Sequence, residues 1–410
     1  MGFASFREIE AYVQEKTLDR LLEPPLKYMA QIYGCILPED TQGRVRAINT
    51  ATDSLYAIIL GDTIYEEVQD IKENWEQYAF LHDTLLADEL SKCVLINLLA
   101  FRLTRLNQYI LSAFDFKIQQ YFDPTVSVCK KECVYVDCGA LDGYTAARFM
   151  LRCPSYKRIY VYEPIEKYYQ ECTENIGELQ AENIVLRKAA VYEKNTILHF
   201  NINIKGSSKA DESGEIAVQG VALDEDIIEP VGFIKMDIEG SEKAALRGAE
   251  RHIRNEAPML AICVYHRPCD MREIPLMIRD MNQGYRFFLR HHQYNPNETV
   301  LYAIPTNGRL SPEGEILPSS IEAACRRLTE RLESNEKAEW DDYHRYLITQ
   351  VQNYSINTSG LLSDLEELRS WAQQLNETNG YLAREIKKRD SVIEKQRKAL
   401  RLTSIFRKNR

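Results

Sequence analysis

Residues 134–143, VYVDCGALDG, join an apolar run to a turn that carries two glycines and two aspartates. Gly139 and Gly143 allow positive φ angles and a close approach of the backbone to a ligand. Asp137 is an acid at the end of the predicted strand, where it could bind an amino group directly or through water. Together with Asp142 in the same turn, these residue types favour a binding site for a small ligand.

A helix should follow this turn, starting near Thr145, whose hydroxyl could cap the first amides. The amino end of a helix favours a negative group nearby. The spacing D-x-G-x-x-x-G differs from the G-x-G-x-x-G of dinucleotide sites and from the G-x-x-x-x-G-K-[ST] of P-loops. It suits a cofactor that carries an amino acid group and a nucleoside but no phosphate chain.

Glu163 ends the next predicted strand, in IYVYEP. An acid there can accept hydrogen bonds from both hydroxyls of a ribose, because open α/β sheets bind ligands at the carboxyl ends of their strands. A D-x-G-x-x-x-G turn alone also occurs where no ligand binds, so Glu163 is what favours a cofactor. The predicted cofactor is S-adenosylmethionine, which has a ribose and an amino acid tail.

A second group of residues could move a proton. In IKMDIEG a strand should end near Asp237, with Glu239 two residues later, and His266 follows the buried run MLAICVY. These strand ends should meet at one edge of the sheet. Transfer of a methyl group from such a cofactor needs an acceptor aligned with the methyl group and a base for any proton that the acceptor loses. We expect His266, with a near-neutral pKa, to be the base and Asp237 or Glu239 to orient it.

A rival chemistry would use oxygen ligands for a metal. Asp237, Glu239 and Asp270 could hold Mg²⁺, which would bind the acceptor and lower its pKa. A magnesium site usually needs oxygen ligands at both strand ends, whereas the second strand end here presents Tyr265 and His266. We therefore predict an enzyme without a metal.

Three regions with different patterns must position these residues. Residues 1–125 carry apolar residues at three- and four-residue steps, which predicts helices that form a lid or docking layer over the cleft, or else a partner-binding unit. Residues 126–309 alternate strand-like runs with helical stretches, which predicts a doubly wound α/β domain. A turn-rich linker at 310–320 precedes a helical region at 321–410.

The last region carries a heptad pattern. Leucines recur every seven residues from Leu361, and a second apolar series follows them by four residues. This predicts a coiled coil over about 361–402, in which Asn379 would fix the register of a homodimer or of a complex with a partner. The alternative is one amphipathic helix packed on its own domain. The basic end, 387–410, could touch an anionic membrane or a glycosyltransferase partner, or form a frayed tail.

Composition argues against several classes of function. The net charge of -10 argues against nucleic-acid binding. The most apolar run, at 93–101, is too short to span a bilayer, and the first residues lack the order of a signal peptide, so we expect a cytoplasmic protein without a transmembrane segment. The ten cysteines form no C-x-x-C pair, which argues against zinc and against a disulfide framework. We expect Arg290, His291 and His292, which follow a predicted strand, to lie on a solvated face; the alternative is contact with the substrate.

Several runs occur together in one order: VYVDCGALDGYTAARF, YVYEPIEKY, FIKMDIEGSEKAALRGAERHI, MLAICVYHRPCDMREIP, YRFFLRHH and ETVLYAIP. Together they resemble the FkbM family of S-adenosylmethionine-dependent methyltransferases, over roughly residues 80–305. The resemblance implies a seven-stranded, Rossmann-like methyltransferase sheet with an antiparallel final hairpin. It also implies methyl transfer, usually to a hydroxyl of a glycan or of a secondary metabolite, as in polysaccharide biosynthesis.

The resemblance carries the family's roles onto individual positions. Asp137, Gly139 and Gly143 fall on the cofactor turn, Glu163 on the ribose acid, and Asp237, Glu239 and His266 at the ends of the fourth and fifth strands. Two other functions stay open. One is a non-catalytic scaffold with this fold that acts through its helical arms and coiled coil. The other is an NAD-dependent oxidoreductase, which the absent G-x-G-x-x-G disfavours.

Overall fold

The computed structural model describes residues 3–56, 60–114, 119–123, 126, 131–202, 208–210, 216–293, 295–306 and 321–330. The chain divides into two compact units, Met1–Tyr346 and Leu347–Arg410, and all described residues lie in the first. The predicted linker and the predicted coiled coil lie outside the described residues. Among the helices in the described part of the chain, none has both the length and the apolar character needed to cross a membrane.

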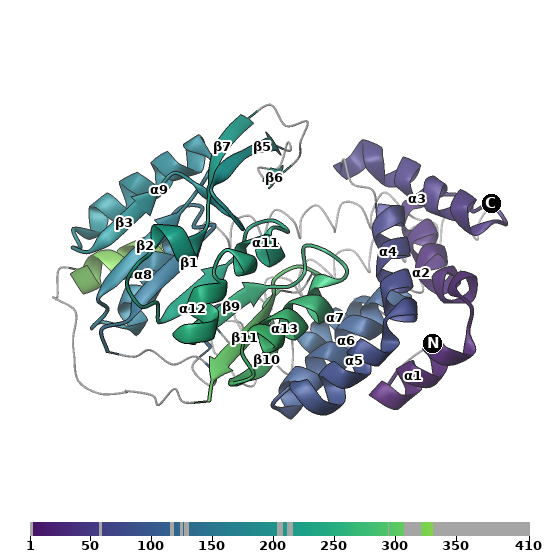
Figure 1. Ribbon diagram of the computed structural model, residues 1–410. Coiled ribbons are helices and arrows are strands. Elements are labelled where there is room, and N and C mark those ends of the chain that lie inside the picture. Colours follow the sequence, from purple (N-terminus) through teal and green to yellow (C-terminus); the bar gives the residue numbers. More distant parts are fainter. Residues whose placement is uncertain are drawn as a thin grey trace, which may run out of the picture. The chain divides into compact units, whose positions relative to one another are not determined.

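The first part of the chain is helical (Figure 1). Two of its helices begin at residues whose side chains satisfy a free amide: Ser5 accepts from the amide of Glu8, and Asp88 from the amide of Ser91. The helices are α1 (Phe6–Glu15), α2 (Leu18–Tyr33), α3 (Thr41–Tyr56), α4 (Leu60–Glu73), α5 (Trp75–Phe80), the π-helix η1 (Leu81–Leu85), α6 (Glu89–Thr104) and α7 (Asn107–Ala113). We call this part the helical region.

A seven-stranded sheet with the order β10-β11-β9-β8-β1-β2-β3 follows. The pairs from β9 to β3 are parallel, while β11 is antiparallel to both β10 and β9. The predicted mostly parallel sheet with an antiparallel final hairpin is thus confirmed. The strands are β1 (Val134–Cys138), β2 (Arg158–Tyr162), β3 (Ile184–Arg187), β8 (Phe233–Met236), β9 (Met259–Cys263), β10 (Tyr285–His291) and β11 (Thr299–Pro305).

Helices cover both faces of this sheet, because its central strands are apolar on both sides. Successive residues of β1 show the division: Tyr135 packs with the helices of one face, and Val134 and Val136 with those of the other. The first face carries α8 (Tyr144–Arg152), α9 (Glu166–Leu179) and the helix at 321–330. The second carries α10 (Leu223–Asp226), α11 (Glu242–Arg247), α12 (Glu250–Asn255) and α13 (Asp270–Met281).

The sequence pattern does not predict a second, smaller sheet, which has the order β4-β7-β5-β6. Its strands lie between β3 and β8 in the chain: β4 (Ala190–Val191), β5 (Thr196–Ile202), β6 (Ser208–Ala210) and β7 (Ile216–Val221). β5 pairs antiparallel with β6 and β7. Runs such as TILHFN signal a strand, but the pairing that takes them out of the main sheet depends on contacts distant in sequence.

The end of β10 is buried, so the expectation of a solvated face at Arg290, His291 and His292 is wrong. Their exposed fractions are 2%, 2% and 9%. Arg290 is held by two carboxylates: its Nη2 lies 2.7 Å from Oδ2 of Asp88 at the start of α6, and its Nε lies 3.1 Å from Oδ2 of Asp123. Burial lowers the pKa of His291 to about 4.

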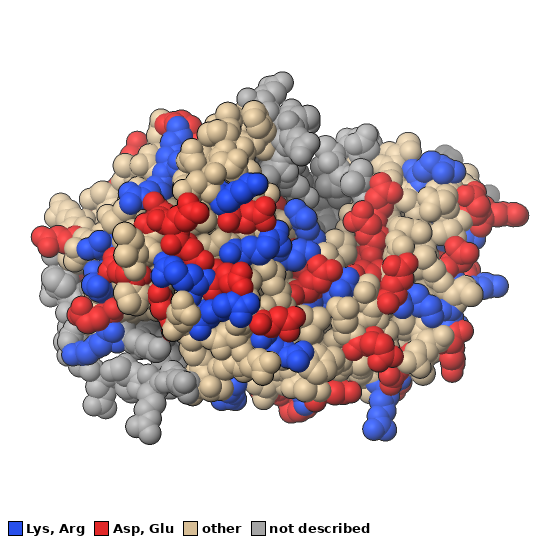
Figure 2. Space-filling model, in the orientation of Figure 1, with Lys and Arg blue, Asp and Glu red and all other residues tan. Residues whose placement is uncertain are grey.

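Charged side chains of both signs are interspersed on the surface shown in Figure 2. Ion pairs between partly exposed side chains include Arg254 with Glu250 at 2.6 Å and Arg247 with Glu193 at 2.8 Å. Such exposed pairs contribute little to stability individually, about 0–1 kcal/mol each. The interactions that position the candidate site are the buried ones.

Candidate active site

The turn after β1 requires glycine at its first position. Gly139 has a φ of 77°, and a Cβ atom there would lie 1.9 Å from the carbonyl oxygen of Asp237. The amide of Gly139 donates to the carbonyl of Tyr162 at the end of β2, at 3.0 Å. The turn is therefore fitted between the ends of β8 and β2, and a larger residue would push them apart.

Gly143 serves the packing of two helices. It precedes α8 with a φ of 82°, and a Cβ there would lie 3.1 Å from both Cys172 Sγ and Ile176 Cγ1 on α9. At that distance the side chains of Cys172 and Ile176 would have to move by a few tenths of an ångström. Gly143 thus permits the approach of α8 and α9 rather than the approach of a ligand.

The start of α8 differs from the sequence expectation. α8 begins at Tyr144, and the hydroxyl of Thr145 makes no cap; it donates to the carboxylate of Asp137 instead. The acid that binds a helix amide is Asp142, whose Oδ1 accepts from the amide of Tyr144 at 3.0 Å. Burial raises the pKa of Asp142. Asp142 and Thr145 therefore brace the turn and the strand next to it.

Asp137 and Lys235 form an ion pair beneath the turn. They are 0% and 2% exposed, and Oδ1 lies 3.2 Å from Nζ. The Lys235 ammonium also donates to the carbonyl of Gly139 at 2.6 Å. Burial alone would lower the pKa of Lys235, but Asp137 and Asp237 keep it above its usual value. Asp137 thus supports the turn from below, and it does not line the cavity above it.

Glu163 is held at the end of β2 by backbone amides. Its Oε2 accepts from the amide of Leu141 at 3.0 Å, and its Oε1 from the amide of Ile165 at 2.9 Å. Burial raises the pKa of Glu163 to about 7, although both amides and Lys235 act in the opposite direction. Each carboxylate oxygen keeps a lone pair for a further donor.

Glu163 and Gly139 line a cavity of about 140 Å³ at the carboxyl ends of β1, β2 and β8. Its other lining residues are mostly apolar, with two acids, two tyrosines and a serine: Leu141, Tyr162, Pro164, Ile165, Tyr168, Ala189, Ala190, Val191, Leu198, Asp237, Ile238, Glu239 and Ser241. Among the described residues that line it, none is Lys or Arg. The position is the one at which open α/β sheets bind ligands.

The structure brings Asp237, Glu239 and His266 together. His266 Nε2 lies 3.4 Å from Asp237 Oδ1 and 3.8 Å from Glu239 Oε2. Its Nδ1 lies 2.8 Å from Oε1 of Glu242, which is fully buried at the start of α11. Burial alone would lower the pKa of His266, but Glu242, Asp237 and Glu239 raise it to about 9. The imidazole is therefore largely protonated at neutral pH, whereas the sequence analysis expected a histidine whose pKa is close to neutral.

Further side chains surround Asp237 from distant segments. The hydroxyl of Tyr121 donates to Asp237 Oδ2 at 2.7 Å, and that of Tyr265 lies 3.3 Å from Asp237 Oδ1 and 3.1 Å from Glu298 Oε1. Burial, and then the charge of Asp237, raise the pKa of Glu298 to about 7. Burial would also raise the pKa of Asp237, but Lys235 and His266 hold it below its usual value. Two neighbouring carboxyls therefore have well-separated pKa values.

Among the residues that the structure describes, two sets of side chains that share Asp237 could hold a cation. In each set the ligand atoms lie within 4.8 Å of one another; the sets are Asp237, Glu242 and His266, and Asp237, Cys263 and Glu298. Asp270, the third oxygen ligand of the magnesium alternative, belongs to neither set within the described part of the chain. Its Oδ1 lies 3.6 Å from Lys243 Nζ, and its Oδ2 accepts from the amide of Arg267.

The sequence analysis did not identify four residues of the site: Tyr121, Lys235, Glu242 and Glu298. Lys235 carried a usable signal, because a lysine inside the apolar strand FIKM needs a buried partner. Glu242 looks like an ordinary acid in the first turn of a helix. Tyr121 and Glu298 carried no local signal, since only the fold brings them to Asp237.

Comparisons with known proteins agree with this geometry. Residues 137–296 match the family described as the Methyltransferase FkbM domain. Among solved structures, a methyltransferase FkbM from Methylobacillus flagellatus is 26% identical, with 58% of this chain and 62% of that chain covered and a TM-score of 0.51. The chain thus spans less than two thirds of that relative's length. The predicted resemblance to the FkbM family is confirmed for this segment.

Two other solved structures match with lower similarity. An rRNA methylase from Streptococcus thermophilus is 15% identical, with 48% of this chain and 93% of that chain covered and a TM-score of 0.29. A putative methyltransferase from Streptococcus mutans in complex with SAH is 12% identical, with 43% and 90% covered and a TM-score of 0.29. No curated protein matches the chain.

Proposed function

We propose that this chain, which carries an FkbM methyltransferase domain, transfers a methyl group from S-adenosylmethionine to a hydroxyl of a glycan or of another hydroxylated small molecule. The observation that carries the proposal is the cavity in which Gly139, Glu163 and Asp237 meet at three strand ends. We call Gly139, Glu163 and their turns the cofactor side. We call Asp237, Glu239, Glu242, Tyr265, His266 and Glu298 the acceptor side.

The lining of the cavity suits S-adenosylmethionine better than a dinucleotide. The carboxylates of Glu163, Asp237 and Glu239 would repel a pyrophosphate, and no basic residue among the described lining residues offsets them. A cofactor with a ribose and positively charged groups meets no such penalty. Glu163 can accept hydrogen bonds from the ribose hydroxyls, and apolar side chains such as Val191 and Leu198 can cover a base.

The acceptor side can bind and deprotonate a hydroxyl. S-adenosylmethionine supplies an electrophilic methyl group, so the chain must align the acceptor and remove one proton. Asp237 lines the cavity, so a hydroxyl bound there can reach it. Lys235 and His266 lower its pKa and so keep the carboxylate ionised and able to accept a proton. We assign the proton to Asp237. Protonated His266, fixed by Glu242, and the neighbouring Glu239 then orient Asp237.

The first experiment is calorimetric titration of the full chain with S-adenosylmethionine and, separately, with NADH. Saturable binding of S-adenosylmethionine that Glu163→Gln weakens supports the proposal. Absence of binding at millimolar cofactor would favour the scaffold alternative, and binding of NADH alone would favour an oxidoreductase.

The second experiment measures S-adenosylhomocysteine release with a panel of sugars and polyols, with and without EDTA. We expect turnover that EDTA leaves intact. His266→Ala should reduce it about 10²-fold, because Asp237 loses a group that orients it, and should leave cofactor affinity unchanged. A rate that rises with pH through about 9, where His266 loses its proton, would make His266 the base in place of Asp237. Loss of activity in EDTA and its return with Mg²⁺ would establish the metal chemistry instead.

A further inference from the structure

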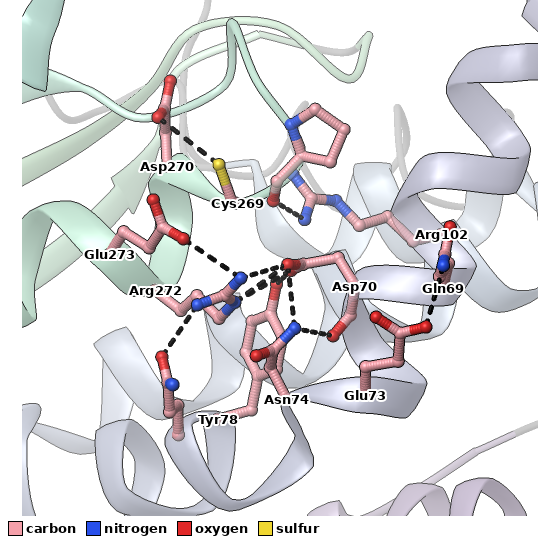
Figure 3. A network of polar contacts seen from close by, with 12 residues as sticks. Gln69, Asp70, Glu73, Asn74, Tyr78, Arg102, Cys269, Asp270, Arg272 and Glu273 are labelled. Carbon is pink, nitrogen blue, oxygen red and sulfur yellow. Dashed lines mark hydrogen bonds and ion pairs between the residues drawn. The ribbon is translucent and has the colours of Figure 1, made fainter.

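The loop between β9 and α13, residues 264–269, carries Tyr265 and His266 and rests against the helical region. Arg102, on α6, is 7% exposed, and its Nη1 donates to the carbonyl oxygen of Pro268 at 2.8 Å (Figure 3). Pro268 is two residues after His266. One guanidinium of the helical region therefore holds the backbone of the loop that presents the imidazole.

A second contact fixes the far end of the same loop. Arg272, in the first turn of α13, donates to Asp70 of α4 through Nε at 2.9 Å and through Nη2 at 2.5 Å, and to Gln77 of α5 through Nη1 at 2.8 Å (Figure 3). Asp70 also accepts from the hydroxyl of Tyr78 at 2.6 Å. The start of α13 is thus anchored to α4 and α5, so the loop has little freedom at its exit.

Acidic side chains of the helical region and of α13 keep Arg102 charged and in position. Its Nε lies 3.5 Å from Oε1 of Glu67 on α4. Burial alone would lower the pKa of Arg102, but Glu67, Tyr78, Asp70 and Asp270 keep it above its usual value. A guanidinium can hold a carboxylate and a carbonyl at once because its donors point in fixed directions. Arg102 therefore joins α4, α6 and the loop.

We propose that the helical region positions the acceptor side, and that Arg102 is the positioning residue that sets His266 against Asp237 and Glu242 through the carbonyl of Pro268. The inference rests on the proposed function for its catalytic meaning. The cofactor side should not depend on Arg102, because the residues that line the cavity come from other loops. A displacement of about 1 Å at a catalytic group can cost about 10²-fold in rate.

Arg105 provides a matched control. It lies at the end of the same helix, is 4% exposed, pairs with the same Glu67 and stacks over the ring of Phe101. Arg102→Met and Arg105→Met each remove one buried guanidinium from Glu67. Only Arg102→Met removes the hydrogen bond to Pro268. A general loss of stability should therefore appear in both variants, whereas displacement of the loop should appear in Arg102→Met alone.

The test uses the full chain and needs no acceptor. Amide hydrogen exchange is measured over 264–270, and His266, one of seven histidines, is titrated by NMR and assigned with His266→Gln. The charged and titratable groups facing it are Glu242, Asp237, Glu239, Asp270, Tyr265 and Glu298. In Arg102→Met we expect exchange in the loop at least about fivefold faster and a His266 pKa that moves from about 9 towards the ordinary value of about 6.5.

In Arg105→Met both quantities should stay at their parent values. Equal changes in the two variants, or none in Arg102→Met, would overturn the inference. If Arg102→Met does not fold, Arg102→Lys is compared with Arg105→Lys by the same measurements, since lysine keeps the charge but not the fixed directions of the donors. Binding of S-adenosylmethionine is measured by calorimetry in parallel. If the parent chain does not bind it, the proposed function is wrong. The hydrogen exchange and the titration then still decide the role of Arg102.

Discussion

The cofactor side and the acceptor side hold their carboxylates in different ways. Glu163 is fixed by the amides of Leu141 and Ile165, both from turns next to it in the sheet. Asp237 is surrounded by side chains, with Tyr121 coming from one distant segment and Tyr265 and His266 from the loop after β9. Backbone amides stay in place whatever the side chains are, whereas a cluster of side chains can be altered one member at a time. The position of the carboxylate on the cofactor side thus depends on the backbone, whereas on the acceptor side it depends on side chains that substitution can change.

Lys235 lies beneath both sides, and its removal should have the largest effect. Lys235→Met leaves Asp137 charged and unpaired in the interior, which should cost about 3–5 kcal/mol of unfolding free energy. Urea denaturation at pH 7 measures the loss. The double variant Lys235→Met/Asp137→Leu should recover most of it, because apolar replacement of a whole buried pair is often close to neutral. A double variant as unstable as the single one would show that the charge of Asp137 is not the cause.

The acceptor side should make stability depend on pH through His266. A histidine with a folded pKa of about 9 and an unfolded pKa of about 6.5 stabilises the fold by roughly 3 kcal/mol, in full below the unfolded pKa. This contribution is lost as the pH rises through the folded pKa. Unfolding free energies of the parent and of His266→Gln, measured across this range, should therefore differ most in acid and converge above about pH 9. A constant difference would mean that Glu242 does not raise the pKa of His266.

The cofactor side should be sensitive to the charge of one residue. Glu163→Gln keeps the shape but removes the ionised acceptor, so S-adenosylmethionine should bind more weakly by about 1.5–3 kcal/mol. Glu166→Gln is a matched control, since Glu166 is exposed, pairs with Lys188 and is not among the residues that line the cavity. Calorimetry gives both values. An unchanged Kd in a folded Glu163→Gln variant would place the ribose contact elsewhere.

Cofactor affinity should also vary with pH, and this is the smallest expected effect. Because the pKa of Glu163 is about 7, the ionised form is lost as the pH falls through that value. If only this form binds, Kd should rise about tenfold between pH 8 and pH 6. The dependence should vanish in Glu163→Gln and persist in His266→Gln. Persistence in Glu163→Gln would point to another titrating group.

The difference between the two sides also explains how far the sequence predicts this protein. The strand-turn-helix pattern around Gly139 and the acid at Glu163 are local signals, and the sheet that they imply is the observed one. Even there, the pattern could not tell that Asp137 pairs with Lys235 instead of lining the cavity. On the acceptor side the strand ends bring Asp237 and His266 together, but the pKa of His266 depends on Glu242. Burial and partners distant in sequence decide such properties, and no local pattern encodes them.

The small sheet beside the cavity has a consequence for biochemical work. In its described part, the buried apolar cluster consists of Ala190 and Val218 with the partly buried Leu198. So small a core should make this sheet one of the first parts to open and to be cut by a protease. Ala190, Val191 and Leu198 also line the cavity, so a ligand that fills it would hold β4 and β5 in place. Limited proteolysis of this segment could then serve as a gel-based screen for ligands, without knowledge of the reaction.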